Sequence, residues 1–395
     1  MELCNRSETA RKIVADDMIL TKELPTTAGS KMLDGYVSLF EAEVLTRLSK
    51  AGYSLCGKAD VGEFAIDLVG ETSFGGAWVT EGKLVHAAAQ IVKEGEAEAA
   101  VTLDVNGSVR RGAAQSGIVS VKPTYGTVSR FGTVPVACSG ETVSVMAQNA
   151  GTCRELLRVI VGHDDKDGTS LPEELCAKVH AEGSAVRRVA VLTDLCNGVD
   201  QEVADKIELF CDGLAAQGIE VCKIENSVIP AARPAWNILM SAELCNNVSR
   251  YDGVKYGYRT EHFTNIDELY TNSRTEAFGP LLKSAILFGS DTLSTENYMK
   301  VYDKALRTRR VIVEEFQKLF GEFDAVLLPA CSTMAYTEET VEKDPSFVFT
   351  ENLYTAPASI TGLPAVVAEG VQLVGKVFSE SALLSAVAAV RKEGN

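Results

Sequence analysis

The feature that most constrains the fold of this chain is a repeated switch between helical and strand-like hydrophobic spacing. Residues 40–52, FEAEVLTRLSKAG, carry apolar side chains at helical spacing, end at a glycine and precede the short apolar segment YSLCG. The same alternation returns in residues 82–104 and 188–224, and a long helical run over residues 295–320 precedes the apolar segment 324–330. The pattern predicts an α/β fold, with functional sites at the carboxyl ends of strands.

Length and composition favour one large unit over several small ones. The chain has 395 residues, of which 46% are hydrophobic, enough to bury a sizeable core. It contains no internal repeat, low-complexity linker or shift in composition. We therefore predict a single domain over residues 1–395.

Charge and residue usage exclude several classes of function. A net charge of −16 argues against direct binding of nucleic acid, which requires a basic face. No run of eighteen apolar residues predicts a membrane span. The ten cysteines form no C-x-x-C pair and the four histidines no H-x-x-x-H pair, so we expect no metal site, no cofactor and no disulfide framework. These features predict a cytoplasmic protein.

A glycine-containing turn at residues 104–114, DVNGSVRRGAA, presents a candidate nucleophile, Ser108, directly after an apolar segment. A serine attacks a carbonyl only when a base accepts its proton and amide groups stabilise the oxyanion that forms. The amides of Asn106, Gly107 and Ser108 are candidates for that oxyanion hole, at a predicted strand-to-helix turn. The alternative is an ordinary N-G-S turn without catalytic function.

Several longer segments give the chain a resemblance to a known family. They are TKELPTTAGSKML (residues 21–33), GKADVGEFAI (57–66), VKPTYGTVSRFGTVPVACS (121–139), VGHDDKDGTS (161–170) and NIDELYTNSRTEAFGPLLKSAILFG (265–289). In this order they resemble the amidase signature family, and within it the glutaminase branch that serves in amidotransferases. The resemblance implies an α/β/α sandwich around a large mixed β-sheet.

The resemblance also implies a catalytic set, which this chain matches only in part. The family hydrolyses amides with a serine nucleophile, a second serine on a cis peptide bond and a lysine as the final base. Its D-T-G-G-S-I-R run matches DVNGSVR and places the nucleophile at Ser108. Asp16 stands at the lysine position and Leu84 at the second serine. A leucine relays no proton, and a carboxylate with an ordinary pKa of about 3.9 is a weak base unless burial raises that pKa.

Two further residues are candidates for substrate binding. In the glutaminase branch, an arginine in S-R-x-E-x-F-G holds the substrate α-carboxylate, and the match here is Arg274. An aspartate before L-x-T-x-P pairs with the substrate α-amino group, and this chain has Asn352 there. The alternatives are a structural ion pair for Arg274 and an unremarkable loop side chain for Asn352.

Two functional hypotheses follow. The first is a pseudoenzyme that keeps the fold and binds a small amide or amino-acid ligand or a protein partner, because loss of catalytic-unit members typically costs about 10⁴–10⁶ in rate. The second is an active serine-dependent amide hydrolase that uses Ser108 with an unrecognised base. The family's N-terminal helices are missing before the segment that contains Asp16. We therefore expect either amidotransferase-type partner subunits or self-association through the surface they would cover.

Overall fold

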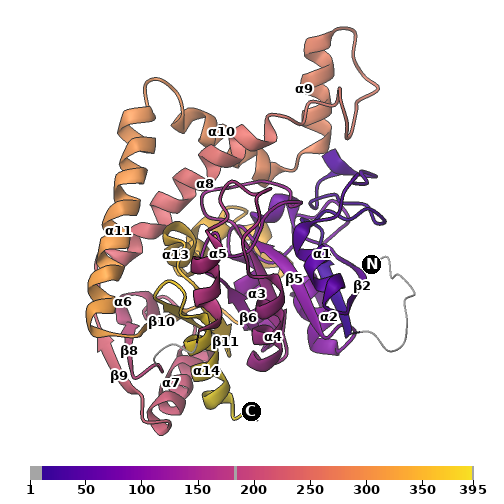
Figure 1. Cartoon of the computed structure of the whole chain (residues 1–395). Helices are drawn as coiled ribbons and strands as arrows, with labels where there is room; N and C mark the ends of the chain where they lie inside the picture. Colours follow the sequence, from indigo (N-terminus) through magenta and orange to yellow (C-terminus); the bar gives the residue numbers. More distant parts are fainter. Residues whose placement is uncertain (1–10, 182–184, 394–395) are drawn as a thin grey trace.

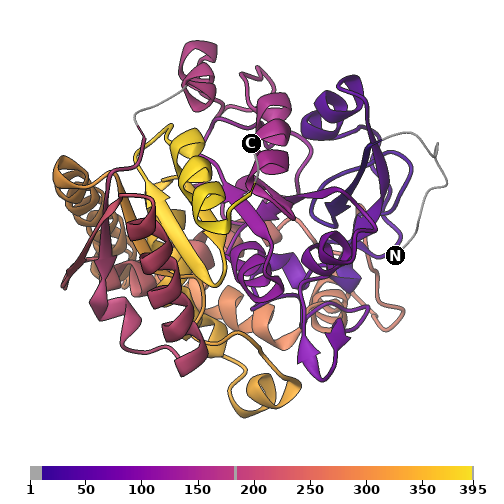
Figure 2. The same ribbon diagram turned by 90° about the horizontal axis from the view of Figure 1, so that it is seen from below.

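One large mixed sheet forms the centre of the molecule. The computed structural model describes residues 11–181 and 185–393. Within these residues, ten strands pair in the order β2-β1-β5-β7-β6-β11-β12-β10-β8-β9, which Figure 2 shows running from the indigo N-terminal strands to the rose β8 and β9. The strands are β1 (Arg11–Asp16), β2 (Tyr53–Ala59), β5 (Ala99–Asp104), β6 (Val119–Lys122), β7 (Thr142–Ala147), β8 (Arg188–Leu192), β9 (Glu220–Ile224), β10 (Ala325–Pro329), β11 (Ala365–Ala368) and β12 (Val371–Gly375).

Three parallel strands bring their carboxyl ends to one edge of the sheet. β1 runs parallel to both β2 and β5, whereas β7 is antiparallel to β5 and β6. The carboxyl ends of β2, β1 and β5 therefore lie at one edge of the sheet, the place where α/β proteins usually carry their sites.

Helices cover both faces of the sheet (Figure 1). On one face α1 (Glu43–Lys50), α4 (Ala150–Ile160), α14 (Glu380–Arg391) and α7 (Gln201–Ala216) pack in a row, and α2 (Ala87–Glu94) and α3 (Ser108–Ser116) pack together on the other. The expected α/β/α layering around a mixed sheet is confirmed.

Alternate side chains of the strands enter different cores. In β1, Ile13 and Ala15 belong to the core that includes α1 and α4, whereas Val14 belongs to the core of α2 and α3. This alternation follows from the two-residue period of a strand, and burial on both faces explains why the strands read as continuous apolar runs.

Eight further helices complete the described part of the chain. In Figure 1, α9 and α10 project above the sheet, and α11 runs along its side. These helices are α5 (Glu173–Cys176), α6 (Thr193–Cys196), α8 (Ala232–Val248), α9 (Ile266–Ala277), α10 (Pro280–Thr292), α11 (Asp303–Glu322), α12 (Glu338–Lys343) and α13 (Phe347–Thr361). None of the described helices is both long and apolar enough to cross a lipid bilayer.

Helix boundaries predicted from periodicity are partly wrong. The helical pattern from residue 82 starts as a helix only at Ala87, because β4 (Lys83–Leu84) pairs instead with β3 (Val79–Thr80) in a small separate ribbon. The run 295–320 divides into a π-helical turn, Tyr298–Tyr302, and α11. Apolar spacing identifies these elements but does not fix their ends.

Candidate functional site

The turn between β5 and α3 carries the candidate nucleophile. Helix α3 begins at Ser108, and Gly107 caps it with φ 89°, a left-handed conformation that favours glycine. A Cβ at Gly107 would lie 2.4 Å from Thr355 Cβ, so the turn packs tightly against α13. The predicted strand-to-helix turn is confirmed. Ser108 is only 4% exposed.

A buried ion pair fixes this turn from both sides. Arg110 of α3 donates through Nε to Asp104 Oδ2 at 2.7 Å, and Asp104 is the last residue of β5. The same guanidinium donates to Gln372 Oε1 at 2.8 Å and to Ser359 Oγ at 2.6 Å. The strand end and the helix start are therefore held to each other and to distant segments.

The side chain of Asn106 has a structural function in the turn. Its Nδ2 donates to the Ile66 carbonyl at 2.7 Å, and its Oδ1 accepts from Trp236 Nε1 at 3.0 Å. Both ends of the amide are occupied by protein groups. A role of Asn106 and Gly107 in an oxyanion hole would thus depend on their backbone amides, and it stays a prediction.

Asp16, the residue matched to the family's lysine, ends β1 with both carboxylate oxygens bonded to the backbone. Oδ2 accepts from the Leu103 amide at 2.6 Å and Oδ1 from the Met18 amide at 3.1 Å. Burial raises the pKa of Asp16 to about 7, although the two amides act in the opposite direction. The carboxyl group thus joins β1 to β5.

Two buried lysines lie in the family-like segments 57–66 and 121–139, and the amine of each is hydrogen-bonded to groups other than Ser108. Lys58 at the end of β2 pairs with Asp17 Oδ1 at 2.7 Å and donates to Thr26 Oγ1 at 2.6 Å. Lys122 donates to the Leu363 carbonyl at 3.1 Å, and burial lowers its pKa to about 7. Among the residues that the structure describes, no amine or hydroxyl hydrogen-bonds with the side chain of Ser108.

Leu84, matched to the second serine, lies in the apolar core of α2 and α3. It is 3% exposed, and its amide donates to the Tyr336 carbonyl at 2.8 Å. Nearby His86 packs against α3, where a Cβ at Gly112 would approach His86 Cβ to 2.3 Å. Burial lowers the pKa of His86 to about 4, so its imidazole is neutral at pH 7. An apolar side chain and a neutral imidazole therefore occupy this part of the core.

The two predicted substrate-binding residues have different positions. Arg274 of α9 donates to the carbonyls of Val248, at 3.0 Å, and Tyr251, at 2.8 Å, and thereby binds the end of α8. The predicted alternative, an ion pair with a carboxylate, is therefore wrong. The carbonyls at the end of a helix have no partner within the helix, and an arginine side chain can donate to them. Among the described residues, the hydrogen bonds of Arg274 go to these carbonyls and none goes to the Ser108 turn.

Asn352 does lie near the Ser108 turn. It is fully buried in α13, so its interpretation as a loop side chain is wrong. Its side-chain amide lies 2.7 Å from Asn237 Oδ1 and 3.5 Å from Arg111 Nη1.

Arg111 is the residue that sequence reasoning missed. It is fully buried and, three residues after Ser108, lies on the same side of α3. It donates to the carbonyls of Leu68 at 2.9 Å and Asp67 at 2.8 Å, and to Thr355 Oγ1 at 3.2 Å. The R-R pair was visible in the sequence, but nothing in it indicated that both arginines are buried. A guanidinium thus occupies the space between α3, α13 and residues 67–68.

Comparison with known proteins identifies the fold and its family. A sequence profile described as Amidase matches residues 13–80 and 87–384. The chain belongs to the amidase family. Two relatives are each named as the A subunit of glutamyl-tRNA(Gln) amidotransferase. The one from Acinetobacter baumannii is 36% identical, and the match covers 94% of this chain and 80% of the relative. The one from Coxiella burnetii is 34% identical, and the match covers 96% of this chain and 82% of the relative.

Comparison with a solved structure shows that the similarity extends to the fold. The crystal structure of the A subunit of glutamyl-tRNA(Gln) amidotransferase from Thermotoga maritima superimposes with a TM-score of 0.82 and 25% sequence identity. The match covers 100% of this chain and 87% of the other. The expected amidase signature architecture is therefore confirmed, and the chain is similar to these amidotransferase proteins over most of its length.

Proposed function

We propose that this amidase-family protein is a pseudoenzyme with little or no amide hydrolysis. The observation that carries the proposal is the state of Asp16. A residue that serves as final base must hydrogen-bond to the relay, whereas the hydrogen bonds of Asp16 come from backbone amides, those of Leu103 and Met18. The carboxyl group of Asp16 therefore joins β1 to β5 and has no hydrogen bond to a relay group.

The surroundings of Ser108 support the same proposal. Leu84 supplies no hydroxyl for a relay, and Lys58 and Lys122 donate to other groups. A nucleophilic serine without a proton acceptor attacks a carbonyl very slowly.

One observation favours the second candidate, an active glutaminase-like amide hydrolase. Burial raises the pKa of Asp16 to about 7, which is suitable for a general base at neutral pH. Ser108 also starts a helix, so its amide is among those without an intrahelical partner. This candidate requires a proton path from the hydroxyl of Ser108 to Asp16, and among the described residues no hydrogen bond of the Ser108 side chain begins one.

For a pseudoenzyme, binding is the remaining function. The relatives are named as amidotransferase subunits. We therefore propose that this chain binds an amidotransferase-type subunit or a second copy of itself, with a small amide or amino acid as the alternative ligand, and acts in the cytoplasm without a cofactor. Size-exclusion chromatography with light scattering, alone and after co-expression with such subunits, tests the assembly. A protein that stays monomeric in both cases contradicts the partner proposal.

The test of catalysis compares the wild-type protein with Ser108→Ala. We expect the two to release ammonia from glutamine at the same background rate, and a fluorophosphonate probe to leave Ser108 unlabelled in intact-mass spectra. Circular dichroism confirms that the variant is folded. Stoichiometric labelling of Ser108, or turnover that the single substitution abolishes, would establish the hydrolase instead.

A further inference from the structure

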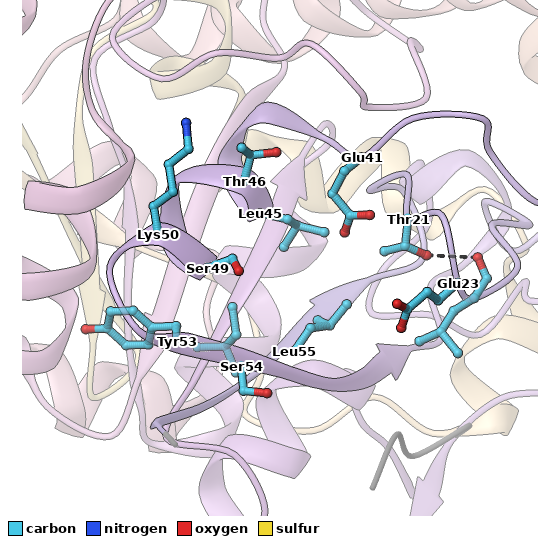
Figure 3. Close-up of a pocket in the computed structure, with 12 residues that line it drawn as sticks. Thr21, Glu23, Glu41, Leu45, Thr46, Ser49, Lys50, Tyr53, Ser54 and Leu55 are labelled. Carbon is cyan, nitrogen blue, oxygen red and sulfur yellow. Dashed lines mark hydrogen bonds between the residues drawn. The ribbon is translucent and has the colours of Figure 1, made fainter. Parts of the chain in front are cut away.

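The two edges of the ten-stranded sheet differ in how charged side chains are arranged beside them. The edge strand β2 borders a cavity of about 430 Å³, which α1, β1 and the loop 21–24 also line (Figure 3). Side chains of both charge signs, Glu23, Glu41 and Lys50, line that one cavity. At the opposite edge, β9, acidic and basic side chains lie on two different helices. The β9 edge therefore presents two separate faces of opposite charge.

Helices α7 and α11 are both bonded to the β9 edge. Lys223 of β9 donates to Glu208 of α7 at 2.6 Å. Asn226, two residues after the strand, donates through Nδ2 to Glu315 of α11 at 2.9 Å. In Figure 1 both helices lie on the left of the molecule, beside β8 and β9. A partner that approaches this edge can therefore contact both helices.

The outer face of α7 is acidic around one exposed leucine. Four residues follow at intervals of three and four and therefore lie on one side of the helix: Glu202, Asp205, Leu209 and Asp212. All four are exposed, and Leu209 is 73% exposed. Within the described part of the chain, none of these three carboxylates has an ion pair. An apolar side chain thus projects from a face whose negative charge is not neutralised.

The outer face of α11 contains a hollow with basic walls. A shallow cavity of about 300 Å³ is lined by Lys304, Arg307, Thr308 and Val311. Val311 is 51% exposed there and supplies an apolar surface. Arg307 pairs with Asp303 at 2.6 Å, whereas Lys304 has no ion pair among the described residues. The hollow therefore suits an apolar side chain with carboxylates beside it.

We propose that the protein forms a two-fold symmetric dimer in which Leu209 of each copy enters the α11 hollow of the other copy. The leucine packs against Val311, and the carboxylates on either side of it face Lys304. A second copy fits because the chain itself supplies both complementary faces. Burial of the two leucines favours association, and the opposite charges determine which helices meet.

The position of the two helices explains why such an assembly ends at two copies. Because α7 and α11 flank the same edge, a two-fold axis at this edge lets both contacts form at once. The inference names the surface for the self-association proposed above and rests on that proposal. It does not involve the Ser108 turn, so the test of catalysis with Ser108→Ala stays separate.

Sedimentation velocity of the wild type and two charge-reversed variants tests the proposal. We expect the wild type to be a dimer that weakens as NaCl is raised. The α7 variant Asp205→Lys/Asp212→Lys should be a monomer at the same concentration, because it sets like charges against each other. The α11 variant Lys304→Glu/Thr308→Glu should be a monomer for the same reason.

An equimolar mixture of the two variants is the decisive sample. Each contact between the α7 variant and the α11 variant joins opposite charges, in both directions across the two-fold axis. We therefore expect the mixture to form a dimer again. A variant that had merely lost its fold would not be rescued by mixing.

A single apolar substitution measures the contribution of the leucine. Leu209→Ser should raise the Kd of the dimer at least about tenfold, since it removes an apolar side chain from each of two contacts. The matched control is Leu39→Ser, because Leu39 is 92% exposed and lies outside both helices. The control should leave the Kd unchanged.

The possible outcomes separate the surface from self-association itself. A wild type that stays monomeric would overturn both this inference and the proposed self-association. If that monomer binds a co-expressed amidotransferase subunit and the variants do not, the two faces belong to that subunit instead. A dimer that persists in both charge-reversed variants, or variants that stay monomeric when mixed, would overturn the assignment of α7 and α11 and leave self-association standing.

Discussion

Two neighbouring strand ends in this protein bury an aspartate in different ways. At the end of β5, Asp104 pairs with the guanidinium of Arg110. At the end of β1, Asp16 accepts only from backbone amides, and Lys58 pairs with the neighbouring Asp17 instead. The hydrogen bond from Leu103 to Asp16 connects the two ends, so they belong to one polar layer along the edge of the sheet.

The difference shows which electrostatic function each end has. A fully buried ion pair with further hydrogen bonds fixes geometry, and removal of one partner leaves a buried charge without compensation. Burial without an ion pair raises the pKa of Asp16 to about 7, although the two amides that hold its carboxyl group act in the opposite direction. The β5 end is therefore fixed in position, whereas the β1 end is sensitive to pH.

The largest expected effect comes from Arg110→Ala. This change leaves Asp104 buried without its cation and also removes the bonds to Gln372 and Ser359. We expect the free energy of unfolding, measured with urea, to fall by about 3–5 kcal/mol. Arg307→Ala, at an exposed pair with Asp303, is the matched control and should change it by less than about 1 kcal/mol. Similar losses in the two variants would refute the structural function of the buried pair.

The next effect is a pH dependence that Asp16→Asn removes. The folded-state pKa of about 7 lies above the unfolded value of about 3.9, so protonation stabilises the fold. This contribution is complete below pH 3.9 and is lost as the pH rises through 7. From pH 5 to pH 8 the wild type should lose about 2.5 kcal/mol of stability relative to Asp16→Asn.

The control for this pH dependence is Asp34→Asn, since Asp34 is exposed on the same part of the chain. It should keep the wild-type slope. Urea unfolding at several pH values gives the slopes directly. Parallel profiles for the wild type and Asp16→Asn would mean that Asp16 is ionised throughout this range.

Much of the fold followed from local spacing. The apolar positions of residues 201–216 repeat at helical intervals, and Val203, Ile207, Phe210 and Leu214 are all buried in α7. Ser108 was also placed correctly at a strand-to-helix turn, because a glycine between an apolar segment and a helical pattern is a local signal. The structure gives this glycine, Gly107, a positive φ. These features need no knowledge of distant residues.

The functions of Arg111 and Arg274 followed from no local signal. Arg111 bonds to residues 67–68 and to Thr355, which lie far from it in the sequence. Arg274 was expected to face a carboxylate, but its partners are carbonyls at the end of another helix, whose position depends on tertiary packing. The sequence shows that an arginine can donate hydrogen bonds. Which acceptors it reaches depends on how distant segments pack, and that is not visible in the local sequence.

The smallest effect tests whether the β5 end is more completely buried than the end of β2, the strand beside β1. The chain has two tryptophans, and each donates to a polar group near one strand end. Trp236 Nε1 donates to Asn106 Oδ1 at 3.0 Å after β5, and Trp78 Nε1 donates to Asp60 Oδ2 at 2.8 Å after β2.

Trp236→Phe leaves a buried acceptor without its donor and should cost about 1–2 kcal/mol. Asp60 is partly exposed, so water replaces the lost donor in Trp78→Phe, and the cost should stay below about 1 kcal/mol. Each variant keeps one tryptophan, so its fluorescence reports unfolding next to the intact strand end, and a larger loss in Trp78→Phe would reverse the assignment of the two ends.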